Sequence, residues 1–236
     1  MRQIVLSLWG WSKKIVFWGF FALVLLQLWY LAQIAFWARF NPSSTSFMNI
    51  RLEALREADP NAQLKHRWVT YDQMSLSLKR AVVAAEDSGF MAHKGVDMDA
   101  MEQAFKRNNR RGKVTHGGST ITQQLAKNLF LTGKRSYLRK GQELIIAFML
   151  EAVWSKRRIL EVYLNVVEWG NGVYGAQAAA QYYYGVNASQ LGGAQSARLA
   201  GMLPAPTYFD KRRNSPFLAR KSGTIQAWLN QVSVPR

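Results

Sequence analysis

The sequence predicts a mainly α-helical domain preceded by one transmembrane helix. Two observations indicate the helical domain. Apolar residues recur at three- and four-residue spacings through most of the chain, and no run of strict apolar–polar alternation is long enough to indicate a strand. The anchor is indicated by a third observation, because the 23 residues from Ile15 to Trp37 carry no charge.

The charge-free run is long enough to cross a bilayer, since at a rise of 1.5 Å per residue it spans roughly 35 Å. A cleaved signal peptide is the alternative, but it would have a shorter apolar region and a small-residue cleavage site. Arg2, Lys13 and Lys14 precede the run without an acid, which favours a cytoplasmic N-terminus. We therefore predict a cytoplasmic segment at 1–14, a membrane helix at 15–37, a linker at 38–48 and a domain at 49–236.

The chain is strongly basic, with 31 Lys and Arg against 14 Asp and Glu and a net charge of +17. Residues 1–42 hold 4 of these basic residues and no acid, which leaves +13 on the remainder. Such a charge predicts an anionic partner. With a membrane anchor, lipid headgroups and lipid-linked phosphates are expected rather than nucleic acid. No cysteine is present, which excludes a disulfide framework and thiol chemistry.

Helical patterns and their stop signals place the elements of the domain in order. The expected helices cover 49–66, 74–86, 98–108, 120–131, 137–154, 156–167, 176–184 and 193–203. Pro60 marks a turn in the helix at 49–66, and Ser119 or Thr120 caps the helix at 120–131. Gly185 ends the helix at 176–184, and Pro204 and Pro206 stop the helix at 193–203.

Glu86 and Asp87 end an apolar helix, with Phe90 and His93 close behind them. A carboxylate at the rim of an apolar wall is suited to accept a proton at neutral pH. The alternative is a pair of solvated acids at a helix end.

Glu143 is a second acid on an apolar helical stripe. Arg139 and Lys140 precede it by four and three residues, so a simple ion pair along the helix is one interpretation. Between the two acids, Gly117 and Gly118 lead into a capped helix that carries Gln123 and Gln124, and its N-terminus offers unpaired N–H groups to an anion.

Four segments in this order resemble the signature blocks of the peptidoglycan glycosyltransferases, glycosyltransferase family 51, which also occur in class A penicillin-binding proteins. The resemblance covers roughly residues 68–206. The segments are Glu86-Asp87-x-x-Phe90-x-x-His93-x-Gly95-x-Asp97, Gly117-Gly118-Ser119-Thr120-Ile121-Thr122-Gln123-Gln124-x-x-Lys127-Asn128, Arg139-Lys140-x-x-Glu143 and Ile159-Leu160-Glu161-x-Tyr163-Leu164-Asn165.

The resemblance implies a lysozyme-like helical head and a smaller jaw, at 97–116, that leans on the membrane. It also implies a monofunctional enzyme of the bacterial inner membrane with its catalytic domain outside the cytoplasm. Ser-x-x-Lys and Lys-Thr-Gly motifs, which a transpeptidase would need, do not occur in the chain. The implied reaction polymerises lipid II into linear β-1,4 glycan and releases undecaprenyl pyrophosphate. Cell-wall synthesis or division proteins are the expected protein partners.

The same resemblance implies the site residues. Glu86 is expected to be the base that deprotonates the acceptor hydroxyl, and Asp87 to hold the local backbone. Glu143 is expected either to orient cations around the donor pyrophosphate, directly or through Mg²⁺ or Mn²⁺, or to be structural. No cofactor is expected to be required and no metal ligands are assigned. The expected substrate-binding residues are Phe90, His93, Thr120, Gln124, Lys127, Arg135, Arg139 and Lys140.

Two rival functions remain open. A lytic transglycosylase or muramidase would share a helical fold and a catalytic glutamate but would cleave glycan, and it would not need four cationic side chains around a pyrophosphate. An inactive cell-wall scaffold would have no chemical need for Glu86 or Glu143.

Overall fold

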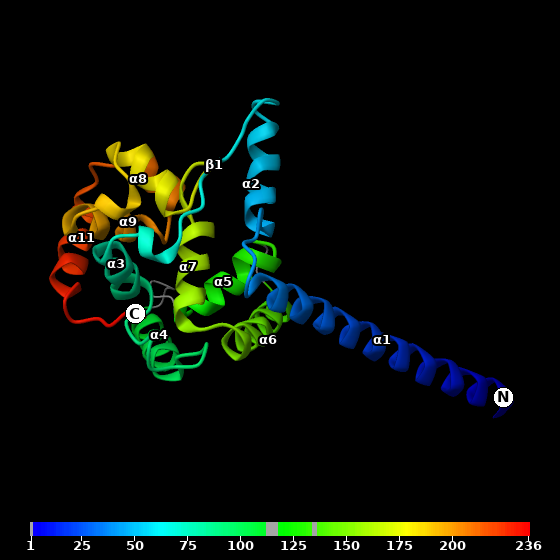
Figure 1. Ribbon diagram of the computed structural model, residues 1–236. Helices are drawn as coiled ribbons and strands as arrows, with labels where there is room; N and C mark the ends of the chain where they lie inside the picture. Colours follow the sequence, from blue (N-terminus) through cyan, green and yellow to red (C-terminus); the bar gives the residue numbers. More distant parts are fainter. Residues whose placement is uncertain (1, 112–117, 134–135) are drawn as a thin grey trace. The chain divides into compact units, whose positions relative to one another are not determined.

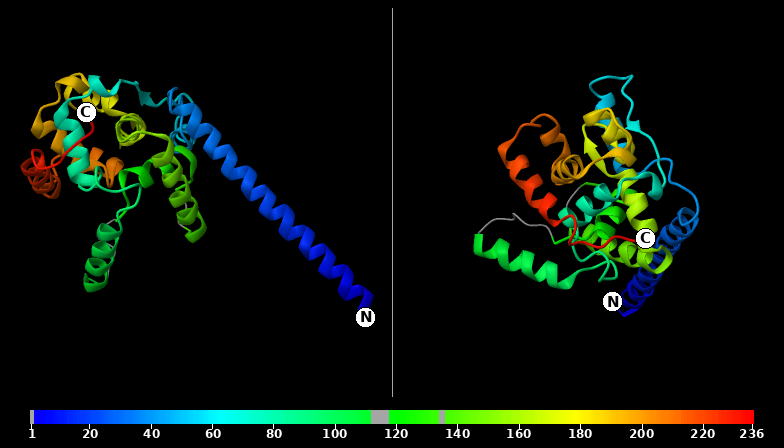
Figure 2. Two further views of the ribbon diagram at one scale, coloured as in Figure 1. Left: turned by 60° about the horizontal axis from the view of Figure 1, so that its bottom comes forward. Right: turned by 60° about the vertical axis from the view of Figure 1, so that its left-hand side comes forward.

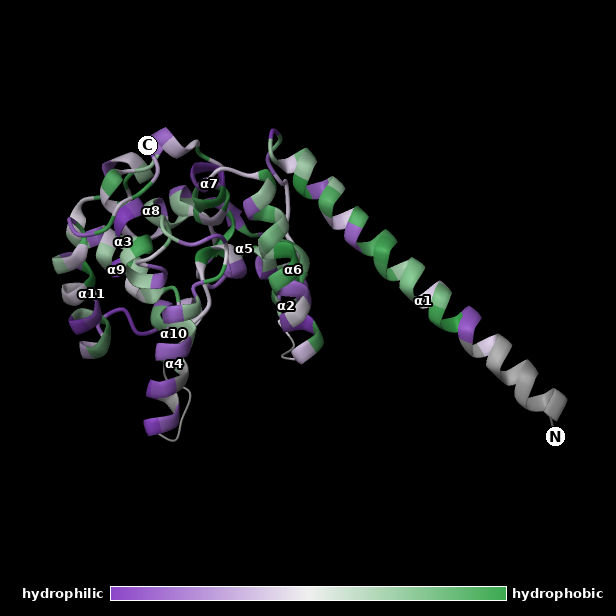
Figure 3. Ribbon diagram, turned by 90° about the horizontal axis from the view of Figure 1, so that it is seen from below, coloured by the Kyte–Doolittle hydropathy of each residue, from purple (hydrophilic) through white to green (hydrophobic). Residues whose placement is uncertain are grey.

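The computed structural model describes residues 2–111, 118–133 and 136–236. The chain divides into two compact units, Met1–Phe40 and Asn41–Arg236. The first unit is one long helix, α1 (Arg2–Trp37), and its apolar character is visible in Figure 3. Among the described residues, one helical segment, Lys13–Trp37, is long and apolar enough to cross a membrane. The expected long apolar helix near the N-terminus is therefore confirmed.

The second unit is mainly helical, as predicted (Figure 1). Its helices are α2 (Ser46–Arg56), α3 (Leu76–Glu86), α4 (Met98–Arg111), α5 (Ile121–Phe130), α6 (Tyr137–Val153), α7 (Lys156–Val166), α8 (Ala176–Tyr184), α9 (Gly193–Met202), α10 (Pro206–Asp210) and α11 (Pro216–Trp228), with two short 3₁₀ turns at Tyr71–Gln73 and Ala188–Gln190.

Hydroxyl caps explain where several of these helices begin. The side chains of Ser75, Thr120, Ser136 and Ser155 each accept a hydrogen bond from the backbone N–H three residues later, at the starts of α3, α5, α6 and α7. These bonds satisfy one of the N–H groups that a helix leaves unpaired at its first turn.

The helices pack as two groups. α5 contacts α6, α7 and α2, while α9 contacts α3, α11 and α10. Figure 1 shows α3, α9 and α11 together on one side of the unit and α5, α6 and α7 on the other. Glu86 ends α3 in the first group, and Gln124 lies on α5 in the second. The packing of the helices within this unit therefore places residues of one group, such as Glu86, against residues of the other, such as Gln124.

A small sheet joins segments that are far apart in sequence. Its strand order is β1 (Lys65–His66), β3 (Val173–Tyr174), β2 (Glu168–Gly170). β1 runs parallel to β3, with Lys65 opposite Val173, and β2 runs antiparallel to β3 with an irregularity between Glu168 and Gly170. The sequence did not indicate these strands, because strands of two or three residues are too short to show alternation.

Three other predictions about the elements need correction. α2 ends at Arg56, well before residue 66, and it begins at Ser46 because the side chain of Thr45 caps it. α4 continues to Arg111 rather than ending at 108. Two helices, α10 and α11, follow the segment at 193–203 that was expected to be the last, and each begins with a proline at its first turn, where the missing N–H costs nothing.

α4 differs from the other helices of this unit in its surroundings. Figure 2 shows it extending away from the neighbouring helices, and Figure 3 shows it as predominantly hydrophilic. It lies within the segment 97–116 that the family resemblance implies is the jaw, of which residues 112–116 are outside the described residues.

Candidate active site

Glu86 is the last residue of α3 and is only partly accessible. Its Oε2 accepts a hydrogen bond of 2.8 Å from Nε2 of Gln124 on α5. Its Oε1 is buried and has no hydrogen-bond partner among the described residues. Burial raises the pKa of Glu86, and the Gln124 hydrogen bond opposes this shift. The environment therefore gives Glu86 a more basic carboxylate than an exposed glutamate has.

Two lysines from different helices also act on Glu86. The positive charges of Lys221 on α11 and Lys127 on α5 lower the pKa of Glu86, although burial prevails. Burial also lowers the pKa of both lysines. Lys221 is half-buried, on a helix that packs against α3. The sequence analysis did not include Lys221, because no helix was expected in its segment.

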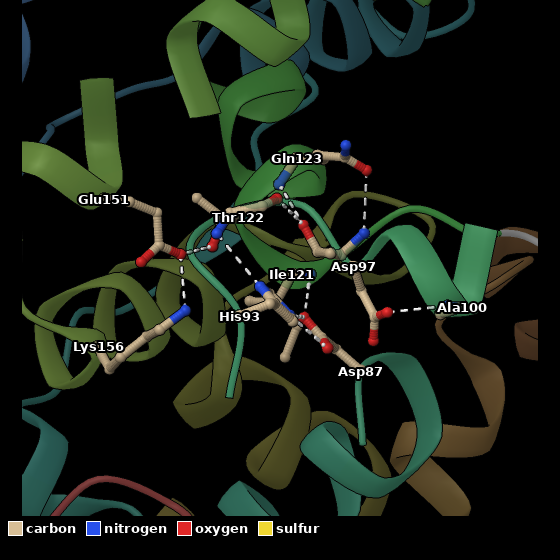
Figure 4. A network of polar contacts seen from close by, with 11 residues as sticks. Asp87, His93, Asp97, Ala100, Ile121, Thr122, Gln123, Glu151 and Lys156 are labelled. Atoms are coloured by element: carbon tan, nitrogen blue, oxygen red, sulfur yellow. Dashed lines mark hydrogen bonds and ion pairs between the residues drawn. The ribbon is translucent and has the colours of Figure 1, made fainter. Parts of the chain in front are cut away.

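Asp87 organises the backbone beside Glu86 (Figure 4). Its Oδ2 accepts a 2.9 Å hydrogen bond from the backbone N–H of Ile121, at the first turn of α5. Nε2 of His93 lies 2.9 and 3.0 Å from the two carboxylate oxygens. Nδ1 of His93 accepts a hydrogen bond from the backbone N–H of Gly95, so the ring proton is on Nε2. His93 therefore donates a hydrogen bond to the Asp87 carboxylate. This network ties the end of α3 to the start of α5.

Asp87, His93 and Asp97 offer ligand atoms that lie within 4.8 Å of one another. Their atoms already bond to protein groups, since His93 donates to Asp87 and Asp97 Oδ1 accepts from the backbone N–H of Ala100 at 2.8 Å. These hydrogen bonds hold the three side chains against the neighbouring backbone, and the role expected of Asp87 stays a prediction.

Thr120 and Phe90 are both buried, and Thr120 lines the smaller pocket that contains Glu86. The hydroxyl of Thr120 donates to the carbonyl of Gly95 at 2.6 Å and accepts from the backbone N–H of Gln123, which fixes the start of α5. The Phe90 ring lies 4.5 Å from Nζ of Lys156, whose ammonium also pairs with Glu151. These contacts give Thr120 and Phe90 positioning roles, and their direct contact with substrate stays a prediction.

Glu143 lies on α6 at the centre of a buried ion-pair cluster. Its side chain is 4% exposed, and its two oxygens pair with Arg139 at 2.7 Å and with Lys140 at 2.5 Å. Lys140 also donates to the hydroxyl of Ser119 at 3.1 Å. The ion pairs at four- and three-residue spacing, which were one interpretation of the sequence, are therefore present.

The ion-pair cluster borders an open cleft of about 530 Å³, which we call the cationic cleft. Three of the residues that line it are cations and one is an acid. Its lining residues are Ser119, Gln124, Lys127, Ser136, Tyr137, Arg139, Lys140 and Glu143. A cleft with this excess of positive charge is suited to hold an anionic group.

A second, smaller pocket of about 220 Å³ contains Glu86, and we call it the acid pocket. Arg107 of α4 also lines it, together with Asp87, Asp97 and the segment 118–120. Ser119 lines both the acid pocket and the cationic cleft, and Gln124 bonds to Glu86 while lining the cleft. The part-buried carboxylate of Glu86 and the cationic side chains of the cleft are therefore adjacent.

Comparisons with known proteins agree with this arrangement. The model of a family described as Transglycosylase matches residues 52–231. The chain belongs to the transglycosylase family. Three relatives are each named biosynthetic peptidoglycan transglycosylase. The relative from Janthinobacterium sp. (strain Marseille) is 54% identical and covers 94% of this chain and 98% of its own length. The relative from Azoarcus sp. (strain BH72) is 54% identical, over 97% and 99%. The relative from Burkholderia orbicola (strain MC0-3) is 52% identical, over 100% and 95%.

Within this transglycosylase domain the structure brings together most of the residues expected at the site. Gln124, Lys127, Arg139, Lys140 and Glu143 line the cationic cleft, and the acid pocket holds Glu86, Asp87 and Thr120. Neither Phe90 nor His93 is among the residues that line the two pockets, although His93 bonds to Asp87, which lines the acid pocket. Arg135 lies outside the described residues.

Some residues that line the two pockets or act on Glu86 were not expected there, among them Ser119, Ser136, Tyr137, Arg107 and Lys221. Ser119 stood in a quoted motif without an assigned role. Arg107 stood in the implied jaw segment, and Lys221 had no sequence signal.

Proposed function

We propose that this chain polymerises lipid II into linear β-1,4 glycan strands and releases undecaprenyl pyrophosphate. The observation that carries the proposal is the position of Glu86 beside the cationic cleft, joined to it through Gln124 and Ser119. One group can take a proton from an acceptor while the neighbouring surface holds the leaving phosphate.

Glu86 is the proposed base for the acceptor's 4-hydroxyl. Forming a β bond from an α-linked donor inverts the anomeric carbon, so a single displacement suffices, and the hydroxyl proton passes to the carboxylate as its oxygen attacks. Burial raises the pKa of Glu86, which strengthens it as a base. Gln124 bonds to its Oε2, and its Oε1 has no hydrogen-bond partner among the described residues, so no described side chain competes for the lone pairs of Oε1.

The leaving pyrophosphate requires positive charge rather than a general acid. Lys127, Arg139 and Lys140 line the cleft and can pair with the charge that develops on it. Glu143 holds Arg139 and Lys140 in place through its two ion pairs. We therefore assign Glu143 an orienting role.

The cationic cleft fits Mg²⁺ or Mn²⁺ poorly. Glu143 is its one lining carboxylate among the described residues, and both of its oxygens already pair with cations. Hard divalent cations prefer several oxygen ligands, which this lining does not supply. We propose that the side-chain cations neutralise the pyrophosphate, and no step of the reaction is assigned to a metal.

Membrane residence agrees with a lipid-linked substrate. The Lys13–Trp37 segment of α1 is proposed to anchor the chain in the bacterial inner membrane with the domain outside the cytoplasm. On α6, Glu143 points into the cluster while Leu138 and Phe148 are 88% and 54% exposed. An exposed apolar stripe on the helix that lines the cleft supports a position close to lipid.

The decisive experiment incubates the purified full-length chain with labelled lipid II and separates the products by size, with Glu86→Gln alongside. We expect polymer from the wild type and a rate lower on the order of 100-fold for the variant, because general-base catalysis contributes about that much. A Glu86→Gln variant that polymerises at the wild-type rate would contradict the assigned base. Cleavage of preformed glycan without polymerisation would instead assign a lytic reaction, and the absence of both activities would indicate a scaffold.

A further inference from the structure

A chain of two part-buried hydrogen bonds links α7 to Glu86. Tyr163 lies on α7 and its side chain is fully buried. Its hydroxyl donates to Oε1 of Gln124 at 3.0 Å. Nε2 of the same amide donates to Oε2 of Glu86 at 2.8 Å. The three side chains come from three helices, α7, α5 and α3, so the chain connects separate parts of the domain to one carboxylate.

The direction of these bonds follows from the chemistry of the three groups. An ionised carboxylate accepts hydrogen bonds and cannot donate, so Glu86 acting as a base requires the NH₂ end of Gln124. The carbonyl end of the amide then faces Tyr163, which must donate. Burial raises the pKa of Tyr163 well above its ordinary value, and the nearby charges of Glu86 and Asp87 add to this shift. Tyr163 therefore keeps its proton and remains a donor.

We propose that Tyr163 is a positioning residue for the transfer reaction, holding Gln124 so that its NH₂ group binds Oε2 of Glu86 and fixes the orientation of the carboxylate. Oε1 has no hydrogen-bond partner among the described residues. The bond from Gln124 is therefore the contact that orients this carboxylate. The inference rests on the proposed function, because it assigns the means by which the base is oriented.

The test replaces Tyr163 by Phe, which keeps the buried ring and removes the hydroxyl. In this variant the carbonyl of Gln124 no longer accepts a hydrogen bond from the Tyr163 hydroxyl. The amide is then free to rotate, and its NH₂ group is no longer held against Glu86. We expect kcat to fall about tenfold, the value of one buried hydrogen bond. The acid limb of the pH profile of kcat/KM should also move to higher pH, since the Gln124 hydrogen bond lowers the pKa of Glu86.

Tyr71→Phe is the matched control. Tyr71 is also a buried tyrosine, and its hydroxyl donates to the carbonyl of Pro235 at 2.7 Å, away from both the acid pocket and the cationic cleft. This variant should change stability without moving the pH profile. A general loss of packing would affect both variants alike.

A double-mutant cycle with Gln124→Leu tests the proposed route through the amide. Once Gln124 is absent, removing the Tyr163 hydroxyl should cause little further loss of kcat. An equal loss in the presence and absence of Gln124 would overturn the proposal, because Tyr163 would then act by another route.

A titration of Glu86 separates this inference from the proposed function. The full chain with ¹³C-labelled glutamate, in detergent, reports the ionisation of Glu86 by NMR, with Glu86→Gln to assign the signal. Tyr163→Phe should raise the observed pKa, whether or not lipid II is polymerised. An unmoved titration together with an unmoved pH profile would overturn the positioning role. A wild type without polymerase activity would refute the proposed function, and the titration would then report only the coupling of Tyr163 to Glu86.

Discussion

Replacing Glu143 by Gln should destabilise the domain, because it leaves two cations facing each other without their shared counter-ion. The Glu143 side chain is 4% exposed, and those of Arg139 and Lys140 are 17% and 35% exposed. Removing one partner of a fully buried pair costs about 3–5 kcal/mol. The partial exposure of the two cations places the expected cost at the lower end, about 3 kcal/mol. For a domain of this length that corresponds to a fall in Tm of about 6–12 °C.

Thermal unfolding of the full-length chain in detergent, followed by circular dichroism, measures the effect of Glu143→Gln. Glu102→Gln is the matched control, since Glu102 pairs with Lys106 at i,i+4 on α4 but both side chains are more than 60% exposed. An exposed pair contributes about 0–1 kcal/mol, so the control should unfold close to the wild type. Equal Tm values for wild type and Glu143→Gln would refute the reasoning that the buried acid holds the cluster together.

Three further outcomes are expected. Lys221→Gln should move the acid limb of the kcat/KM profile to higher pH, because the positive charge of Lys221 lowers the pKa of Glu86. Lys221→Arg keeps the charge and should restore the wild-type profile. Identical profiles for the wild type and both variants would contradict the interaction between Lys221 and Glu86. Gly175→Ala should lower stability by more than about 2 kcal/mol in chemical denaturation, because Gly175 has φ of +82° and an added Cβ would lie 2.7 Å from a backbone oxygen. The control Gly185→Ala, with φ of +67° and open space around it, should cost only about 1 kcal/mol, and equal losses would remove the steric argument. Lys140→Ala should weaken binding of the pyrophosphate-linked donor by about tenfold, the scale of one charge-assisted hydrogen bond, and unchanged binding and turnover would leave Lys140 as a structural partner of Glu143 alone.

The sequence was sufficient to predict the helix ends, caps and ion pairs that depend on residues three or four positions apart. The bounds of α8 agree with the prediction, because Gly185 supplies the left-handed residue that ends the helix. The cap at Thr120 and the pairing of Glu143 with Arg139 and Lys140 also follow from separations of three or four residues along one helix. The motifs then indicated the family, which the comparisons confirmed.

Prediction failed where a short element carried too little pattern. β1 has two residues and β2 has three, so neither shows the alternation that identifies a strand. α10 begins at Pro206, which was interpreted only as a stop signal, although proline is also favoured at the first turn of a new helix. α11 begins at Pro216, where no element was predicted. Because α11 was not predicted, Lys221 was not recognised as a candidate residue of the site.

The sequence by itself determined which chemical groups the site contains, and the tertiary structure decided how they meet. Glu86 and Glu143 could be recognised as candidate acids from their local patterns. Only the packing of α3, α5 and α7 shows that Tyr163 reaches Glu86 through Gln124. Only the packing of α11 on α3 accounts for the effect of Lys221 on the base. The physical reason is that helical periodicity specifies which face of a helix is apolar, whereas the partner of that face depends on how the whole chain packs.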